Sequence, residues 1–399
     1  MEKEGNLKNI LIISAHYYPL KGGTPTHTEN LCTELSNLGY NVSLITEDNV
    51  GDDLDAYDAA KPYRVIRLRT KPRFRTDTYF PILVGRRITR YIEELNPDII
   101  NISTGNYVPL GLKLSKKQKI PIVYTVHNVP PEEYTFNISS IAAINEPLKK
   151  IYFRFISHLA KFCMKHGRYN HIISVSERTK ERLIKAGAKE KQITIVSNGV
   201  AKPKETYARP VDDSAWFTIL VTAGIIEHKG QYELVLAMED ILKKIPNARC
   251  VLAGPIRSQA YADKIHSLIA EKGYTQNVIL RGECSEIELE NQYAKCDVYV
   301  QPSYQEGFCI AIMEAMIREK PVIGTAVGAI PELLADGRGI VVEKPEPKLI
   351  ADAVITMYHD SEFRKKSAKA ACEYVMKEYE WGRVAEETVA VYEKMICQK

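Results

Sequence analysis

The sequence predicts an α/β protein built from two doubly wound parallel sheets, one in each of two domains. Short apolar segments alternate with helical segments along the chain, and most of them are continuously apolar, as strands buried on both faces should be. With 399 residues the chain is too long for one ordinary core. A polar, turn-rich stretch from Ser197 to Trp216 separates two sets of strands, so we place the linker there.

Thirteen strands are expected from the apolar runs. Those before the linker are Asn9–Ser14, Val42–Thr46, Tyr63–Arg67, Ile99–Ile102, Ile122–Thr125, His171–Val175 and Ile193–Val196. Those after it are Thr218–Ala223, Arg249–Ala253, Val278–Arg281, Asp297–Gln301, Pro321–Gly324 and Ile340–Val342. Because ligands bind beyond the carboxyl ends of such strands, the residues that follow each strand are the candidates for a site.

The sequence predicts the positions of three helices. One is expected to begin near Pro25 and to end before Gly39, and another to follow Ser176, a good N-cap residue. The last one runs from about Trp381 to Met395. Its apolar residues recur at helical spacing and predict a stripe packed on a neighbour: Trp381, Val384, Ala385, Val389, Tyr392 and Ile396.

Composition excludes several classes of protein. Hydrophobic residues make up 45% and charged residues 26%, which is ordinary for a globular protein, and no apolar run is long enough to span a membrane. The N-terminus MEKEGNLKN has no apolar segment of a secretion signal. The eight cysteines form no CxxC pair, which argues against a zinc site or a disulfide framework. We therefore expect a cytoplasmic protein.

Charge is distributed unevenly. Residues 1–200 hold 29 Lys and Arg against 20 Asp and Glu, whereas the remainder holds 25 against 30. A basic cluster extends from Arg64 to Arg90, and the segment from Pro147 to Tyr169 predicts an amphipathic helix with a basic face. That helix either packs on the core with a solvated face or contacts a membrane. The first half is expected to meet an anionic bilayer or a phosphate-bearing acceptor, with nucleic acid the weaker interpretation.

The most informative stretch is QPSYQEGFCIAIMEAM, from Gln301 to Met316. It sets Glu306 in a loop after a buried strand and Glu314 eight residues later, in a helix expected from Phe308 onward. At about 1.5 Å per helical residue the two carboxylates can lie up to roughly 12 Å apart, the span of a nucleotide sugar. Two unrelated surface glutamates are the plainer interpretation of the spacing alone.

A second motif strengthens the first one. The run PVIGTAVGAIPELLADGRGIVV, from Pro321 to Val342, together with the Glu-x7-Glu spacing, resembles the signature of the GT-B glycosyltransferases of retaining family 4. The similarity extends over nearly the whole chain. The chain departs from the family pattern at Cys309 and Lys320, where relatives usually carry glycine.

The resemblance implies two Rossmann-like domains that face a central cleft, with the terminal helix crossing back to the first domain. Residues 1–198 with 380–399 would form an acceptor-binding domain, and residues 199–379 a domain that binds the nucleotide sugar. It further implies a retaining transfer of a hexose or hexose derivative from a nucleoside diphosphate sugar, with UDP or GDP as the nucleotide. The acceptor hydroxyl would belong to cell-surface polysaccharide or glycolipid biosynthesis.

The donor site follows from the family motifs. Lys229 matches a Lys-Gly element beyond the first strand of the second half and would neutralise the departing diphosphate, although Ile225 stands where relatives often carry Arg. Glu314 would bind the ribose and Glu306 the sugar. The remaining donor-binding residues implied by the resemblance are Phe308, Ile310, Ala311 and Gly282, with the amides near Ile310 and Ala311 directed at the diphosphate.

The first half supplies the remaining candidates. Gly22 and Gly23 form either a turn that needs positive φ or a loop that approaches a ligand closely, and the resemblance implies that this loop borders the acceptor and donor phosphates, with His16 nearby. His127, directly after a strand, matches a family histidine that orients the transferred sugar. The implied catalytic residues are thus Glu306, His127 and Lys229.

No Asp-x-Asp pair follows a strand, so we expect neither a metal ion nor another cofactor, with positive side chains and helix amides acting on the diphosphate instead. Two alternatives remain at this point. One is another GT-B enzyme, such as a sugar-nucleotide epimerase or a phosphorylase. The other is a catalytically silent subunit that binds a sugar nucleotide, an idea prompted by Ile225, Cys309 and Lys320.

Overall fold

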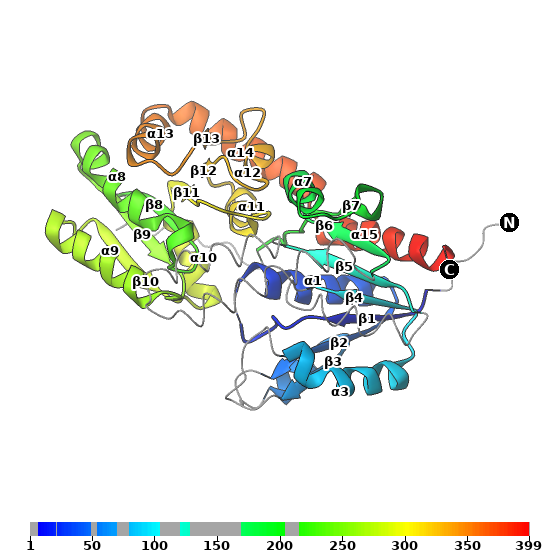
Figure 1. Ribbon diagram of the computed structural model, residues 1–399. Coiled ribbons are helices and arrows are strands. Elements are labelled where there is room, and N and C mark those ends of the chain that lie inside the picture. Colours follow the sequence, from blue (N-terminus) through cyan, green and yellow to red (C-terminus); the bar gives the residue numbers. More distant parts are fainter. Residues whose placement is uncertain are drawn as a thin grey trace. The chain divides into compact units, whose positions relative to one another are not determined.

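The computed structural model describes residues 7–20, 22–48, 54–69, 80–103, 120–127, 169–203 and 215–398. The chain divides into two compact units (Figure 1), residues 1–199 with 381–399 as unit 1 and residues 200–380 as unit 2. Each of these limits lies one residue from the boundary expected from the sequence. The chain therefore leaves unit 1 after Gly199 and returns to it at Trp381.

Unit 1 contains a seven-stranded parallel sheet in the order β3-β2-β1-β4-β5-β6-β7. Its strands are β1 (Asn9–Ile13), β2 (Asn41–Asp48), β3 (Arg64–Arg69), β4 (Ile99–Ile102), β5 (Ile122–Val126), β6 (His171–Ser174) and β7 (Ile193–Ile195). Every residue of β4, β5 and β6 is buried, as expected for strands covered on both faces. The described helices of the unit are α1 (Gly23–Asn37), α2 (Asp55–Ala59), α3 (Phe80–Leu95), α7 (Glu177–Lys185) and α15 (Trp381–Cys397).

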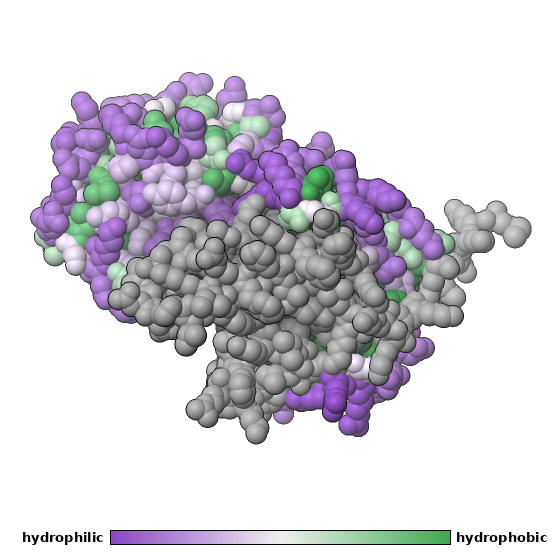
Figure 2. Space-filling model, in the orientation of Figure 1, coloured by the Kyte–Doolittle hydropathy of each residue, from purple (hydrophilic) through white to green (hydrophobic). Residues whose placement is uncertain are grey.

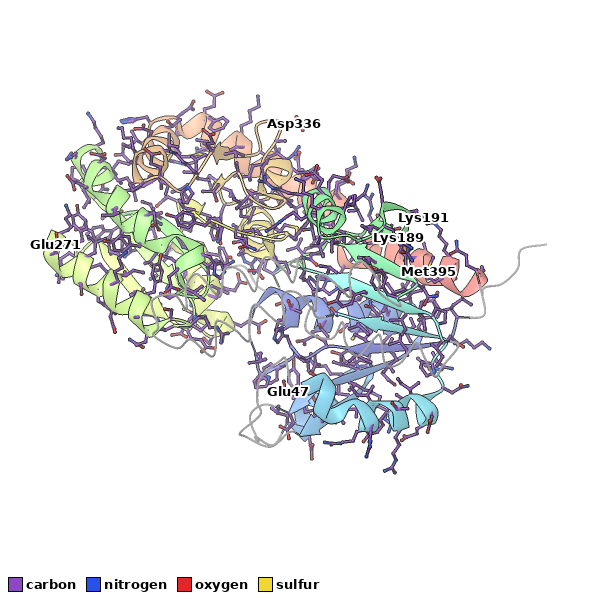
Figure 3. All side chains as sticks on the ribbon, in the orientation of Figure 1. Glu47, Lys189, Lys191, Glu271, Asp336 and Met395 are labelled. Atoms are coloured by element: carbon purple, nitrogen blue, oxygen red, sulfur yellow. The ribbon has the colours of Figure 1, made fainter. Side chains whose placement is uncertain are left out.

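The terminal helix α15 belongs to unit 1, as the family resemblance implied. Its buried apolar residues share one core cluster with Leu31 and Leu35 of α1, and Met395 extends that stripe into its last turns (Figure 3). The predicted stripe is confirmed, with Ile396 only partly buried. Ser176 is confirmed as the N-cap of α7, because its hydroxyl accepts a hydrogen bond from the Thr179 amide.

Unit 2 contains a six-stranded parallel sheet in the order β10-β9-β8-β11-β12-β13. Its strands are β8 (Phe217–Thr222), β9 (Ala248–Ala253), β10 (Val278–Gly282), β11 (Val298–Gln301), β12 (Val322–Thr325) and β13 (Ile340–Val342). Its helices are α8 (Gln231–Lys244), α9 (Gln259–Lys272), α10 (Glu286–Lys295), α11 (Ile310–Met316), α12 (Ile330–Leu333), α13 (Pro347–His359) and α14 (Ser361–Glu378). A short 3₁₀ turn, η5 (Glu227–Lys229), lies between β8 and α8.

All thirteen predicted strands are present, with ends that shift by at most two residues. The starts of two helices are also shifted, each by two residues. Helix α1 begins at Gly23 rather than near Pro25, directly after Gly22 with φ of 143°. Helix α11 begins at Ile310 rather than Phe308, because Cys309 adopts a left-handed conformation with φ of 72° and interrupts the chain before the first turn.

Within the described residues, no helix is both long and apolar enough to cross a membrane. The described part of the face drawn in Figure 2 is mainly hydrophilic, with apolar residues scattered over it. The expected amphipathic segment Pro147–Tyr169 lies outside the described residues, apart from Tyr169 itself. So do Lys71, Arg73 and Arg75 of the basic cluster.

Candidate active site

The strand order of unit 2 reverses between β8 and β11. From β8 the chain continues to β9 and β10 on one side, and it then returns to place β11 on the other side of β8. Doubly wound sheets bind their ligands at such a point, outside the carboxyl ends of the strands. Lys229 follows β8 and Glu306 follows β11, so both predicted residues lie on loops at this edge.

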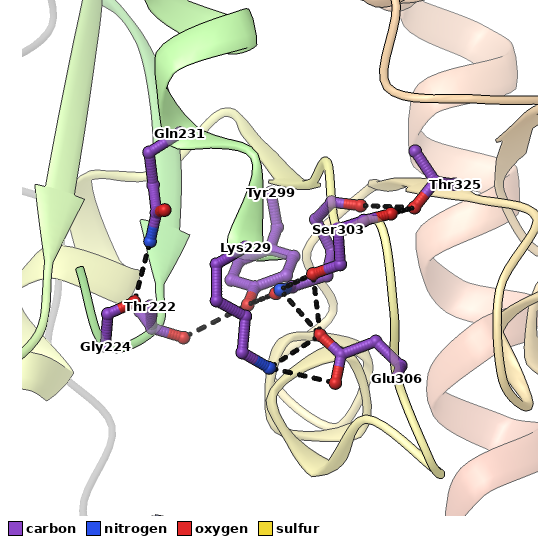
Figure 4. Close-up of polar contacts among 9 residues, drawn as sticks. Thr222, Gly224, Lys229, Gln231, Tyr299, Ser303, Glu306 and Thr325 are labelled. Atoms are coloured by element: carbon purple, nitrogen blue, oxygen red, sulfur yellow. Dashed lines mark hydrogen bonds and ion pairs between the residues drawn. The ribbon is translucent and has the colours of Figure 1, made fainter. Parts of the chain in front are cut away.

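Lys229 and Glu306 form an ion pair. The Lys229 Nζ donates to Glu306 Oε1 at 2.7 Å and to Oε2 at 2.9 Å (Figure 4). The side chains are 23% and 7% exposed. Burial raises the pKa of Glu306, but the Lys229 charge and the hydrogen bonds outweigh it and the pKa is lowered. The pKa of Lys229 is raised, since the Glu306 charge outweighs the effect of burial. Both groups are therefore charged at neutral pH.

The two oxygens of Glu306 differ in their surroundings. Oε1 also accepts a hydrogen bond from the Ser303 hydroxyl at 2.6 Å and one from the Gln301 amide at 3.1 Å. Among the described side chains, Oε2 has Lys229 as its hydrogen-bond donor. A carboxylate oxygen accepts about two hydrogen bonds, so Oε1 is saturated and Oε2 retains capacity for a donor such as a sugar hydroxyl.

The side chain of Gln301 is itself held in place. Its oxygen accepts a hydrogen bond from the Tyr299 hydroxyl at 2.7 Å, and its nitrogen donates to Ser303 Oγ at 2.8 Å. The Thr222 hydroxyl, at the end of β8, lies 3.2 Å from the Tyr299 hydroxyl and 3.0 Å from that of Tyr293. This buried network links the ends of β8 and β11 and fixes the orientation of Glu306 (Figure 4).

A close backbone approach brings the two loops together. Gly230, with φ of 68°, ends the η5 turn that carries Lys229, and a Cβ on it would lie 1.8 Å from the carbonyl oxygen of Pro302. Only glycine can therefore occupy this position. The Tyr304 amide also donates to the His228 carbonyl at 2.9 Å. These two contacts pack the turn that carries Lys229 directly against the loop that leads to Glu306.

Glu314 lies on α11, and the electrostatic environment of its carboxyl group differs from that of Glu306. Burial raises the pKa of its carboxyl, and Arg318, one turn further along, opposes that effect. Arg318 is paired with Glu290 of α10, and its side chain lies over the Tyr293 ring at 4.6 Å. The hydroxyl of Tyr293 lowers the pKa of Glu314 as well. Through Tyr293 and Thr222, Glu314 borders the same network that holds Glu306.

The other predicted donor residues are placed as follows. Phe308 is buried with its ring against Tyr379 at 5.5 Å, so a donor contact at this position would come from its backbone. Ile310 and Ala311 are the first two residues of α11, so their amides lie in its first turn, as expected. Gly282 ends β10 with φ of 77°, and its carbonyl accepts from the Gly254 amide at 2.7 Å.

The candidates of the first half occupy the carboxyl edge of the unit 1 sheet. Gly22 and Gly23 are exposed at the start of α1, and His16 follows β1. His127 follows β5, and its Nε2 lies 3.3 Å from the hydroxyl of Ser103, which follows β4. Burial lowers the pKa of His127 well below its usual value, and the neighbouring His27 and His16 lower it further. His127 is therefore a neutral ring at pH 7.

Sequence reasoning missed several residues that shape this region. Gln301 and Ser303 lie within the Glu-x7-Glu stretch but were not predicted to hold Glu306, although a glutamine at the end of a fully buried strand is a signal of a polar network. His27 was also missed. Its ring packs edge-on against those of His127 and Trp381, at 4.4 and 5.4 Å, and burial lowers its pKa to about 4.

No group of three or more His, Cys, Asp or Glu side chains suited to holding a metal ion occurs among the described residues. Ile225 is completely buried in the core of unit 2. A side chain at position 225 thus points away from solvent, and the cation expected there from the family pattern is absent.

The comparisons with known proteins agree with this geometry. The family model "Glycosyl transferases group 1" matches residues 211–374, and the model "Glycosyltransferase Family 4" matches residues 21–202. The first match lies within unit 2 and the second almost entirely within unit 1, and together they cover most of the chain.

Two of the relatives match along most of their length. The D-inositol 3-phosphate glycosyltransferase of Corynebacterium glutamicum is 23% identical over 98% of this chain and 97% of its own. The alpha-monoglucosyldiacylglycerol synthase of Acholeplasma laidlawii is 26% identical over 84% of this chain and 85% of its own. Among solved structures, the Anabaena protein Alr3699/HepE in complex with UDP-glucose has a TM-score of 0.77 at 17% identity, covering 97% of this chain and 99% of that one. The chain is a transferase with the GT-B fold and belongs to the group 1 glycosyltransferases.

Proposed function

We propose that this enzyme transfers a hexose from UDP-hexose to an acceptor hydroxyl with retention of the anomeric configuration. The observation that carries the proposal is the Lys229–Glu306 pair at the point where the strand order of unit 2 reverses. A cation beside an oriented carboxylate suits a substrate that joins a diphosphate to a sugar. The similarity to a protein that binds UDP-glucose supports UDP as the nucleotide.

Each residue has a distinct role in this proposal. Lys229 neutralises the charge that develops on the diphosphate as its bond to the anomeric carbon breaks. Glu306 Oε2 accepts a hydrogen bond from a sugar hydroxyl, since Oε1 is already saturated. Glu314 accepts from the ribose hydroxyls. His127, which is neutral, orients the sugar by hydrogen bonding rather than acting as a charged acid. Gly22, Gly23 and His16 border the acceptor.

A thermal-shift panel tests the donor assignment. UDP, GDP, ADP and dTDP are added to the purified protein with and without a divalent ion, and Lys229→Ala and Glu314→Ala serve as variants. A ligand at one hundred times its dissociation constant adds about 2.7 kcal/mol to the free energy of unfolding. UDP alone should shift the wild type, in EDTA as well as in Mg²⁺, and both substitutions should abolish the shift. If no nucleotide shifts the wild type, the donor site is wrongly assigned.

Turnover separates a transferase from a silent binding subunit. The purified protein should release UDP from UDP-glucose when an acceptor is present, and slowly by hydrolysis without one. Lys229→Ala should lose both reactions. Nucleotide binding with no release of UDP in any acceptor mixture would instead support the silent subunit.

We further propose that the acceptor is lipid-linked. The excess of basic residues before position 200 and the similarity to a synthase named for a glucosylated diacylglycerol support this proposal. Co-sedimentation with vesicles tests it: vesicles of anionic lipid should bind the protein at low salt and release it at high salt, and neutral vesicles should not bind it. Equal binding to both vesicles, or to neither, contradicts the proposal.

A further inference from the structure

The loop after β8 lacks a cation that the family pattern places beside the diphosphate. The residues at this point are Gly224, which has no side chain, and Ile225, whose side chain is completely buried in the unit 2 core. Lys229, six residues beyond Ala223, remains on the same loop. A diphosphate carries more negative charge than one ammonium group neutralises, so a second cation is expected at this edge.

Arg257, from the neighbouring loop after β9, occupies the space beside Gly224. A Cβ built on Gly224 would lie 3.1 Å from Arg257 Cγ and 4.0 Å from its Nε. The stem of the arginine thus runs through the volume that a side chain at position 224 would take. Arg257 is an exposed residue on the loop that follows β9, at the carboxyl edge of the sheet.

The backbone around Arg257 is fixed to the β8 loop. The Ile225 amide donates to the Pro255 carbonyl at 2.9 Å, and the Arg257 amide donates to the Ile225 carbonyl at 3.1 Å. A Cβ on Gly254 would lie 2.0 Å from the Ala223 carbonyl oxygen, which shows how closely the two loops pack. These contacts fix the position of the Arg257 backbone relative to the loop that carries Lys229.

A side-chain hydrogen bond also connects the loop after β9 with the η5 turn. The hydroxyl of Ser258 donates to Glu227 Oε1 at 2.8 Å, and Glu227 begins the turn that ends with Lys229. Backbone and side-chain hydrogen bonds therefore join the loops after β8 and β9 at both ends.

We propose that Arg257 supplies the second cation for the diphosphate of the nucleotide donor, from the β9 loop instead of the β8 loop. The planar guanidinium donates two parallel hydrogen bonds to phosphate oxygens, a geometry that an ammonium cannot provide. This inference rests on the proposed donor site of unit 2. It explains how the chain binds a diphosphate although Ile225 replaces the arginine of the family pattern.

Calorimetric titration of the full chain with UDP and with uridine tests this role. Arg257→Ala should weaken binding of UDP about tenfold to a hundredfold, the loss expected for a hydrogen bond between charged groups. Binding of uridine, which has no phosphate, should be unchanged. Lys272→Ala is the matched control, because it also removes one positive charge but lies in the last turn of α9, paired with Glu239 on the surface. It should leave both titrations unchanged.

Relocating the arginine gives a second test. Gly224 does not have a left-handed backbone, so a larger residue is tolerated there once the space is free. Gly224→Arg alone should bind UDP no better than the wild type, because the stem of Arg257 fills that space. The double variant G224R/R257A carries a new guanidinium at position 224. It should bind UDP at least tenfold more tightly than Arg257→Ala does.

The outcomes separate this inference from the proposed function. UDP binding that depends on Lys229 and Glu314 but is equal in Arg257→Ala and wild type overturns the role of Arg257 and leaves the donor site intact. Equal loss of UDP and uridine binding in Arg257→Ala, at unchanged thermal stability, also overturns it, because the effect would then not involve phosphate. If the wild type binds neither ligand, the donor site itself fails.

Discussion

Lys229 contacts both carboxylate oxygens of Glu306, so removal of either side chain leaves a mostly buried charge without its partner. Lys229→Ala should therefore lower the free energy of unfolding by about 3 kcal/mol, the lower end of the cost of breaking a buried pair. Chemical denaturation measures this loss.

The control for this prediction is the double variant K229M/E306Q, which removes both charges. It should recover most of the stability lost in Lys229→Ala but no glycosyl transfer, since both proposed functional groups are gone. If Lys229→Ala were as stable as the wild type, the ion pair would contribute little to the free energy of unfolding.

Ser303→Ala should shift the pH dependence of activity. The Ser303 hydroxyl is one of the groups that lower the pKa of Glu306, so its loss raises that pKa. The acid limb of the kcat/KM profile should then move to higher pH. Ser367→Ala, which removes another buried serine hydroxyl of unit 2, should leave the profile in place. An unmoved acid limb in Ser303→Ala would mean that another group controls it.

The ionised carboxylate of Glu314 lowers the stability of the folded chain. Its pKa is raised in the folded chain, so the ionised carboxylate is unfavourable there and stability is recovered as pH falls through that raised pKa. Glu314→Gln should accordingly raise Tm at neutral pH and weaken UDP binding. The difference in Tm should shrink on acidification, because protonated Glu and Gln are alike in charge. A lower Tm for Glu314→Gln at neutral pH would contradict this assignment.

His127 should not titrate near neutral pH. Burial and the nearby His27 and His16 keep its pKa well below the usual value of a histidine. In an NMR titration its ring resonances should stay constant between about pH 6 and 8, where exposed histidines change. Comparison with His127→Gln assigns the signals. A midpoint near about 6.5 would show that the ring is accessible to water and charged on acidification.

Gly199 and Trp381 meet where the chain leaves and re-enters unit 1. A Cβ on Gly199 would lie 2.4 Å from the nearest atom of the Trp381 ring, whereas a Cβ on Gly382 meets no atom within 4 Å. Gly199→Ala should therefore destabilise the protein by about 1–3 kcal/mol through overpacking. Gly382→Ala, within α15, should stabilise it by about 0.5–1 kcal/mol. Denaturation curves of the two variants check both signs, and equal stability would contradict the close contact.

The fold could be predicted from the sequence because parallel strands buried on both faces leave continuous apolar runs. Val298–Gln301 and Ile122–Val126 are examples, and both were found at nearly the expected positions. The start of α11 could not be predicted in this way. The left-handed conformation of Cys309, a position where relatives usually carry glycine, delays α11 by two residues.

Individual candidate residues such as Lys229 and Glu306 could be named from the sequence, but their arrangement in space could not. Lys229 and Glu306 are 77 positions apart, and their pairing depends on the close approach of Gly230 to Pro302. No local pattern encodes such a contact. The same holds for Arg257, whose stem lies against Gly224 only because two loops from adjacent strands pack together.

Because the chain leaves unit 1 after Gly199 and returns to it at Trp381, the two units are completed at different times during synthesis. A ribosome delivers residues 200–380 before it reaches Trp381, so unit 2 is complete while unit 1 still lacks α15. At about 5–20 residues per second this interval lasts roughly ten seconds or more. During that time the apolar face of α1 that packs on α15 has no cover. The unit encoded second can therefore finish folding first, and the nascent first unit is the part of the chain that a chaperone would protect.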